Sequence, residues 1–222
     1  MQRRQERRLL PLNLQFNVKR IGIFGGSFNP VHLGHTALAA YICDQGLVDE
    51  VWMMVSPQNP LKQNLELLDE QHRLAMLQLA VAPYPTLQAC DFEFHLPRPS
   101  YTYHTLQALR KAYPDCTFSL IIGEDNWQCF DRWYRSEEIL RETPLIVYPR
   151  DSVESLERSV ERRKQLSTFN FQLSILENPP LFPYSSTEVR TALAAGSDAR
   201  GMLHPAVVAY IAEYRLYAPH LQ

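Results

Sequence analysis

Short apolar runs alternate along the chain with longer stretches in which apolar residues recur every three or four positions. The short runs are rich in β-branched and aromatic residues and predict strands, whereas the longer stretches predict amphipathic helices. This alternation favours an α/β fold, with a parallel sheet flanked by helices. The predicted strands are residues 20–24, 51–55, 87–92, 117–122, 145–148 and 171–176. The predicted helices are residues 33–45, 69–81, 103–112, 136–141, 153–166, 187–195 and 205–214.

The pattern predicts a single domain over residues 18–218. A chain of 222 residues with 45% hydrophobic content can bury one large core. Residues 1–17 are basic, and their apolar stretch is short and broken by Pro11, Asn13 and Gln15, which predicts a disordered extension. A secretory signal would need a longer apolar region and a cleavage site. An Arg-rich transit peptide and an over-early start codon are the alternatives.

Net charge, hydropathy and cysteine content limit which partners and which cellular compartment the sequence favours. A net charge of −2 and a pI near 6.4 give no footprint for nucleic acid, so any anion site must be local. No apolar run reaches membrane-spanning length, so we expect no membrane partner. The four cysteines are scattered, without a C-x-x-C pair, which favours free thiols in a reducing cytoplasm. The sequence leaves the oligomeric state open.

The segment after the first predicted strand has the features of a phosphate site. Gly25 and Gly26 lack side chains, so their backbone can approach a polyphosphate closely. Pro30 ends the strand, and the next helix directs its positive end at the same turn. His32 and His35 are one helical turn apart and would both face the anion. The alternatives are ordinary loop residues, or a zinc site, although zinc helices usually space histidines by four and need a third ligand.

Three further loops at strand ends carry candidate binding residues, at the edge where such sheets bind ligands. Prolines extend the loop after residue 55, and Lys62 ends it with a positive charge suited to phosphate. Asp125 could accept hydrogen bonds from a ribose or cap a helix. Ser185 or Ser186 could cap a helix on which Arg190 offers a planar fork of donors to phosphates. A solvated lysine, a plain cap and a surface arginine are the structural alternatives.

These segments resemble the motifs of a known enzyme family. Residues 25–35, GGSFNPVHLGH, resemble the GxFxPxHxGH signature of the nucleotidyltransferase superfamily. Four further segments resemble motifs of the bacterial nicotinate-nucleotide adenylyltransferases, and the likeness covers residues 20–217. Tyr184 departs from the usual isoleucine, and Asn29 stands where many relatives have Asp. The four segments are SPQNPLK (56–62), SYTYHTL (100–106), IIGED (121–125) with WY (133–134), and YSSTEVR (184–190).

The resemblance implies a Rossmann-like nucleotidyltransferase fold with a C-terminal helical portion. It implies transfer of the adenylyl group of ATP to nicotinate mononucleotide, with Mg²⁺ held through the ATP phosphates and no metal ligand from the protein. The implied catalytic residues are His32, His35, Lys62 and Arg190. The implied ATP-binding residues are Gly25, Gly26, Phe28, His32, His35, Gly123, Asp125, Ser185, Ser186, Thr187 and Arg190. The implied mononucleotide-binding residues are Ser27, Lys62, Thr102, Trp133 and Tyr134.

The most detailed expectation concerns selectivity between nicotinate and nicotinamide mononucleotides. Trp133 could stack on a flat ring or belong to the core beside Phe130. The hydroxyl of Thr102 and the backbone N–H groups around Trp133 and Tyr134 are expected to favour a carboxylate over an amide. The alternatives within the class are pantetheine-phosphate and nicotinamide-mononucleotide adenylyltransferases. Outside it, a nucleotide-binding regulatory module without turnover is disfavoured by the intact set of catalytic residues.

Overall fold

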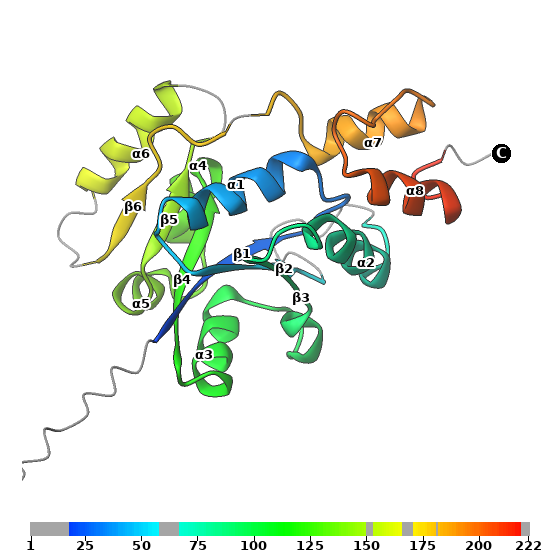
Figure 1. The fold of residues 1–222 in the computed structure, drawn as a ribbon. Helices are drawn as coiled ribbons and strands as arrows, with labels where there is room; N and C mark the ends of the chain where they lie inside the picture. Colours follow the sequence, from blue (N-terminus) through cyan, green and yellow to red (C-terminus); the bar gives the residue numbers. More distant parts are fainter. Residues whose placement is uncertain (1–17, 58–66, 150–152, 166–170, 181, 219–222) are drawn as a thin grey trace, which may run out of the picture.

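A computed structural model describes residues 18–57, 67–149, 153–165, 171–180 and 182–218. Its described residues form a six-stranded sheet in the order β3-β2-β1-β4-β5-β6, in which all neighbouring strands are parallel (Figure 1). Because the chain crosses from central β1 to β2 on one side and later to β4 on the other, the sheet is doubly wound and the expected α/β class is confirmed. The strands are β1 (Lys19–Gly26), β2 (Glu50–Val55), β3 (Leu87–Cys90), β4 (Cys116–Gly123), β5 (Leu145–Tyr148) and β6 (Leu173–Ile175).

Helices connect the strands and cover both faces of the sheet. Within the described ranges, no helix combines the length and the apolar character that crossing a bilayer requires. The described helices are α1 (Leu33–Asp44), α2 (Glu70–Val81), α3 (Thr102–Ala112), α4 (Glu124–Gln128), α5 (Ser136–Glu142), α6 (Val153–Gln165), α7 (Ser186–Ala194) and α8 (Pro205–Glu213), with 3₁₀ turns η1 (Phe92–His95) and η2 (Phe130–Arg132).

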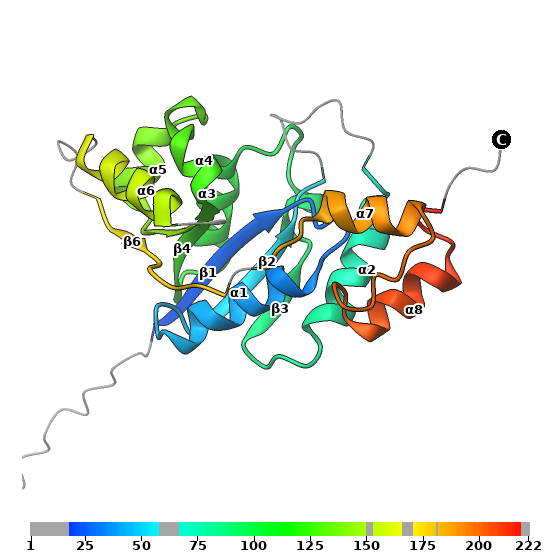
Figure 2. The same ribbon diagram turned by 90° about the horizontal axis from the view of Figure 1, so that it is seen from above.

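Successive residues of the central strands point to opposite faces and build two cores. On one face, Phe24 and Met53 belong to a core with residues of α1, α2, α7 and α8. On the other face, Ile23 and Met54 belong to a core with residues of α3, α4 and α5. Figure 2 shows α7 and α8 side by side next to α2, so the expected C-terminal helical portion closes one face of the sheet near the end of β1.

Three local features differ from the sequence prediction. Gly25 and Gly26 are the last two residues of β1 rather than a loop after it. The strand predicted over residues 87–92 ends at Cys90, because Phe92 begins the η1 turn. The sequence pattern does not predict α4 and η2, since elements of five and three residues are too short to show a periodicity.

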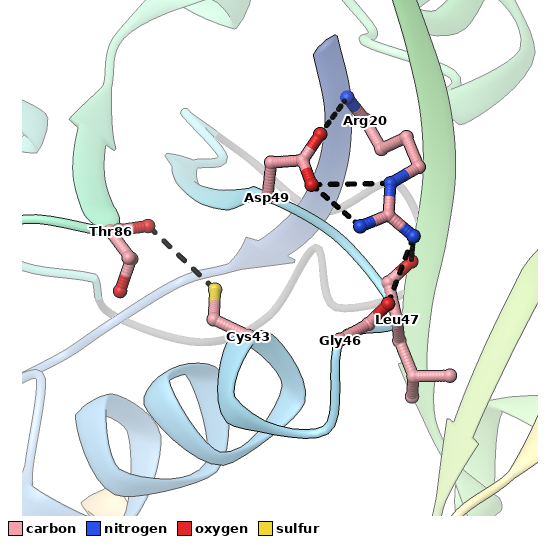
Figure 3. Close-up of polar contacts among 6 residues, drawn as sticks. All are labelled: Arg20, Cys43, Gly46, Leu47, Asp49 and Thr86. Atoms are coloured by element: carbon pink, nitrogen blue, oxygen red, sulfur yellow. Dashed lines mark hydrogen bonds and ion pairs between the residues drawn. The ribbon is translucent and has the colours of Figure 1, made fainter.

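The amino-terminal edge of the sheet is fixed by Arg20. Its backbone N–H donates to Oδ2 of Asp49 at 2.8 Å, and its guanidinium donates to Oδ1 at 2.6 Å and to the carbonyl of Gly46 at 2.9 Å (Figure 3). These contacts join the start of β1 to the turn between α1 and β2. Nearby, the Cys43 thiol contacts the carbonyl of Thr86, and burial raises its pKa. All four cysteines are free thiols, as expected.

Candidate active site

The carboxyl ends of β1 and β4 border a cavity of about 410 Å³. This is the point where connections leave the central strand in opposite directions, and where open α/β sheets bind ligands. Residues far apart in sequence meet here, from the ends of β1 and β4 and the starts of α1, α3 and α7. The predicted site residues in its lining are Gly25, Gly26, Ser27, Phe28, His32, His35, Thr102, Gly123, Trp133, Ser185, Ser186, Thr187 and Arg190.

The two glycines at the end of β1 differ in what surrounds them. A Cβ on Gly26 would lie 2.9 Å from Cζ of Phe28, whose ring is buried. Phe28 has a φ of 44°, an uncommon backbone conformation for a residue with a side chain. A Cβ on Gly25 would meet no heavy atom within 4 Å among the described residues. Gly26 therefore shapes the turn, whereas Gly25 leaves the strand end open to a ligand.

His32 and His35 lie against each other at the start of α1, with ring centroids 3.7 Å apart. The backbone N–H of His32, the N-cap residue, donates to Nδ1 of His35 at 3.1 Å. A nitrogen that accepts a hydrogen bond carries no proton, so this contact assigns the Nε2–H tautomer to a neutral His35. The Phe28 ring packs edge-on against His35 at 5.1 Å. His35 is therefore a fixed donor, oriented by backbone and aromatic contacts.

Gly34 leaves space for the ring of His32. A Cβ on Gly34 would lie 3.0 Å from Nδ1 of His32 and 3.2 Å from Cβ of Phe182. The first turn of α1 contains no acidic residue, so the positive end of the helix reaches the histidines uncompensated and favours an anion. Among the described residues, no group of three or more His, Cys, Asp or Glu side chains is placed to hold a metal ion, so the zinc alternative lacks a third ligand there.

The start of α7 is bonded to the turn after β1. Oγ of Ser186 donates to the carbonyl of Pro30 at 2.9 Å, and Nη1 of Arg190 donates to the carbonyl of Asn29 at 2.8 Å. These contacts join positions 156 and 161 residues apart. Arg190 thus lines the cavity with part of its guanidinium already hydrogen-bonded to the turn. That its other N–H groups bind phosphates stays a prediction.

The sequence leaves open whether Ser185 or Ser186 caps this helix, and the structure shows that Ser185 is the N-cap of α7. Its Oγ accepts the backbone N–H of Glu188 at 3.4 Å, and the Glu188 carboxylate accepts the N–H of Ser185 at 2.6 Å. Ser186 is the first residue of the helix and bonds the neighbouring turn instead. The hydroxyl of Ser185 therefore caps the helix, and that of Ser186 bonds the turn after β1.

Gly123 lines the cavity, but Asp125 does not. Asp125 is exposed in the first turn of α4, and its Oδ1 lies 2.5 Å from the position that a Cβ on Gly123 would occupy. Cζ of the Tyr148 ring lies 3.2 Å from the same Cβ position. A side chain at position 123 would therefore displace the Asp125 carboxylate and press on the Tyr148 ring, while the ribose contact expected of Asp125 stays a prediction.

Trp133 lines the cavity with its ring 5.1 Å from that of Phe130. Its backbone N–H donates to the Phe130 carbonyl at 3.0 Å in the η2 turn, so the expectation that this N–H is available to a substrate was wrong. The indole N–H is buried and has no hydrogen-bond partner in the described part of the chain. Tyr134 is 45% exposed beside Tyr101 and does not line the cavity, so its substrate contact gains no support.

Glu93 is a cavity residue that the sequence analysis missed. It is 8% exposed and is the single carboxylate among the described lining residues. Its Oε1 accepts the hydroxyl of Thr105 at 2.9 Å, and burial raises its pKa. The sequence does carry one indication of a buried acid, because Glu93 stands between Phe92 and Phe94. The predicted strand ends at residue 92, so Glu93 is assigned to no element.

Two predictions fall on residues that the structure does not describe. Lys62 lies within residues 58–66, outside the described ranges. The disordered extension predicted over residues 1–17 also lies outside them. The role of Lys62 and the state of the extension stay predictions.

The sheet order, the open glycine at the end of β1 and the paired histidines at a helix start define a nucleotidyltransferase of the cytidylyltransferase-like class. The model of the cytidylyltransferase-like family matches residues 23–192. Within this class, the chain belongs to the nicotinate-nucleotide adenylyltransferase family, as its relatives show.

A Bacteroides thetaiotaomicron protein named "probable nicotinate-nucleotide adenylyltransferase" is 48% identical over 198 residues, which cover 89% of this chain and 93% of that protein. A Flavobacterium johnsoniae protein of the same name is 36% identical, with coverages of 89% and 98%. The solved structure of Plasmodium falciparum nicotinic acid mononucleotide adenylyltransferase complexed with NaAD shares the fold at a TM-score of 0.73 and 23% identity. The match covers 92% of this chain and 100% of that one.

Proposed function

We propose that the chain transfers the adenylyl group of ATP to nicotinate mononucleotide, giving deamido-NAD and pyrophosphate in a step of NAD biosynthesis. The observation that carries the proposal is the composition of one cavity. Its lining joins the open end of β1, the paired histidines and the start of α7, which suit phosphates, to Trp133 and Thr102, which suit the mononucleotide. A relative of this name that is 48% identical supports the choice of substrates.

The attacking group is a phosphate oxygen of the mononucleotide, which is anionic at neutral pH. It forms a bond to the α-phosphorus of ATP while the bond from that phosphorus to the bridging oxygen of the β-phosphate breaks. Pyrophosphate leaves with the electron pair. No proton has to be removed from the attacking oxygen, so the protein acts by alignment and by stabilising the charge that develops on the phosphates.

His35 supplies a donor that is already in place. Because its Nδ1 accepts the N–H of His32, its Nε2–H is the group that would donate to a phosphate oxygen, with no change of protonation. Arg190 also lines the cavity, and its remaining N–H groups would hold the outer phosphates. Gly25 would let the α-phosphate approach the end of β1.

We also propose Mg²⁺ as the cofactor, carried by the triphosphate. The described lining residues set a single carboxylate, Glu93, against two histidines and Arg190, a set that suits phosphates better than a bare cation. Mg²⁺ is commonly held by substrate phosphates and water, and bound there it would neutralise the leaving pyrophosphate. The four free thiols support a cytoplasmic location.

Product analysis tests the function directly. Purified protein with ATP, Mg²⁺ and nicotinate mononucleotide is expected to form deamido-NAD and pyrophosphate in equal amounts. A reaction without the mononucleotide serves as the control for ATP hydrolysis. Formation of ADP, or of no dinucleotide with folded protein, would contradict the proposal. Parallel reactions with nicotinamide mononucleotide and with phosphopantetheine test the two alternatives within the class.

A further inference from the structure

Arg73 is a buried charge in α2 to which neither the motifs nor the proposed mechanism gives a role. Its side chain is 1% exposed and ranks among the largest fully buried side chains of the described residues. A buried guanidinium is expensive to desolvate unless all of its donors are used. The partners of those donors therefore indicate what the residue does.

All the hydrogen bonds found for Arg73 in the described residues go to main-chain carbonyls. Nη1 donates to the carbonyls of Ser27 at 2.7 Å and Ser56 at 2.8 Å. Nη2 donates to the carbonyl of Pro57 at 3.1 Å, and Nε to that of Leu68 at 2.8 Å. One side chain thus joins the turn after β1, the loop after β2 and the approach to α2.

Two of the bonded residues belong to the cavity wall. Ser27 and Ser56 line the cavity, and the N–H of Ser56 donates to the carbonyl of Gly26 at 2.9 Å. The distance between the two loops at the β1–β2 side of the cavity therefore depends on Arg73. ATP is assigned to the end of β1, His35, α7 and the end of β4, and none of these residues accepts a hydrogen bond from Arg73 in the described structure.

The positive charge of Arg73 has no carboxylate bonded to it in the described residues. The nearest acidic neighbour on its helix, Glu70, accepts two bonds from Arg98 instead. Arginine stays charged at any physiological pH. Glu70 and Asp69 interact with the guanidinium electrostatically without a hydrogen bond to it, and the carbonyl oxygens carry no net charge, so its field reaches the lining residues Ser27 and Ser56. An anionic ligand at that wall would be attracted.

We propose that Arg73 is a positioning residue for the mononucleotide half of the site, which sets the spacing of the two loops and supplies a positive charge behind them. This inference rests on the proposed function. Arg73 touches no substrate in this account, because four backbone carbonyls surround its donors. Its effect is expected in the binding of the mononucleotide and not in that of ATP.

Two substitutions of Arg73 separate its effect on the spacing of the two loops from the effect of its positive charge. Arg73→Lys keeps the charge, but an ammonium cannot reach carbonyls on three segments, whereas Arg73→Met removes the charge as well. With each substrate varied in turn, we expect Arg73→Lys to raise the KM for nicotinate mononucleotide at least tenfold, with the KM for ATP changed less than threefold. Arg73→Met should raise the mononucleotide KM further. The exposed Arg141, paired with Glu137 on α5, provides the control Arg141→Met, with both constants unchanged.

The outcomes distinguish the possible failures. If the wild-type protein forms no deamido-NAD, the proposed function fails whatever Arg73 does. If the wild type is active, equal effects of Arg73→Lys on both KM values, or no effect on either, overturn the positioning role. A lysine variant that circular dichroism shows to be unfolded at every temperature also overturns it, because Arg73 then serves the fold alone.

Discussion

The hydroxyl of Tyr217 donates a hydrogen bond of 2.7 Å to Oδ1 of Asn29, 188 residues earlier in the chain. Asn29 is 3% exposed and lies in the turn after β1, where Arg190 bonds its carbonyl. The segment after α8 therefore reaches back to the turn that holds the histidines. The contact attaches the end of the C-terminal helical portion to the site.

Tyr217→Phe should destabilise the protein by about 1 to 3 kcal/mol near pH 8, because Oδ1 of Asn29 is left buried without this donor. Burial raises the pKa of Tyr217 above its unfolded value of about 10. The folded state thus holds the phenol proton more tightly, and this stabilisation is complete below about pH 10 and is lost as pH rises further. Denaturant unfolding of both proteins should therefore show a gap that narrows above pH 10. Tyr214→Phe, at a 51% exposed position, is the control and should show little change. A constant gap up to pH 11.5 would contradict the assignment.

His35→Ala should lower kcat/KM at least a hundredfold while leaving the fold intact, since one preorganised donor to a reacting oxygen contributes about 3 to 4 kcal/mol. His35→Gln, which can place an N–H near the position of Nε2, should recover part of that loss. Steady-state kinetics, with circular dichroism to verify folding, measure both. Near-normal turnover of the alanine variant would remove His35 from the mechanism.

The two glycines of β1 form a matched pair. Gly26→Ala places a methyl group 2.9 Å from the Phe28 ring and should cost about 1 to 3 kcal/mol of stability as well as activity. Gly25→Ala meets no described neighbour, so it should leave the melting temperature within a few degrees of wild type while reducing kcat/KM. Thermal melts beside kinetics distinguish the two. An active, stable Gly25→Ala protein would show that no phosphate approaches this strand end.

Trp133→Phe keeps an aromatic ring but removes the indole N–H, which is buried without a partner in the described residues. If that N–H donates to the substrate carboxylate, the preference for nicotinate over nicotinamide mononucleotide should fall about tenfold, because losing a donor removes roughly 1 to 3 kcal/mol of discrimination. The ratio of the two kcat/KM values is the measurement. An unchanged ratio assigns Trp133 to stacking alone.

Much of the fold could be predicted from the sequence because its signals are local. Apolar runs separated by helical periodicity give a parallel sheet, and His32 and His35 follow from their spacing after a strand. Ser185 as the cap could not be chosen over Ser186, since both fit the same pattern. The internal bond of the Trp133 backbone N–H could not be foreseen, because the η2 turn that uses it is too short to predict.

The residues that were missed depend on contacts between distant segments. Arg73 looks like any polar residue of an amphipathic helix, and only the fold brings it to the carbonyls of Ser27 and Ser56. Glu93 becomes part of the cavity because η1 turns it inward beside Thr105. Periodicity describes one element at a time and carries no signal for either contact.

Adenylyl transfer to nicotinate mononucleotide is tested most directly by measuring kcat/KM for nicotinate mononucleotide and nicotinamide mononucleotide side by side, with the same Mg·ATP concentration and the products identified. The buried indole N–H of Trp133, together with the hydroxyl expected of Thr102, should leave a carboxylate well bonded and an amide poorly matched. We expect deamido-NAD to form with an efficiency at least about a hundredfold above that for NAD. Equal efficiency with both mononucleotides would contradict the assigned substrate, and no adenylyl transfer to either would contradict the central claim.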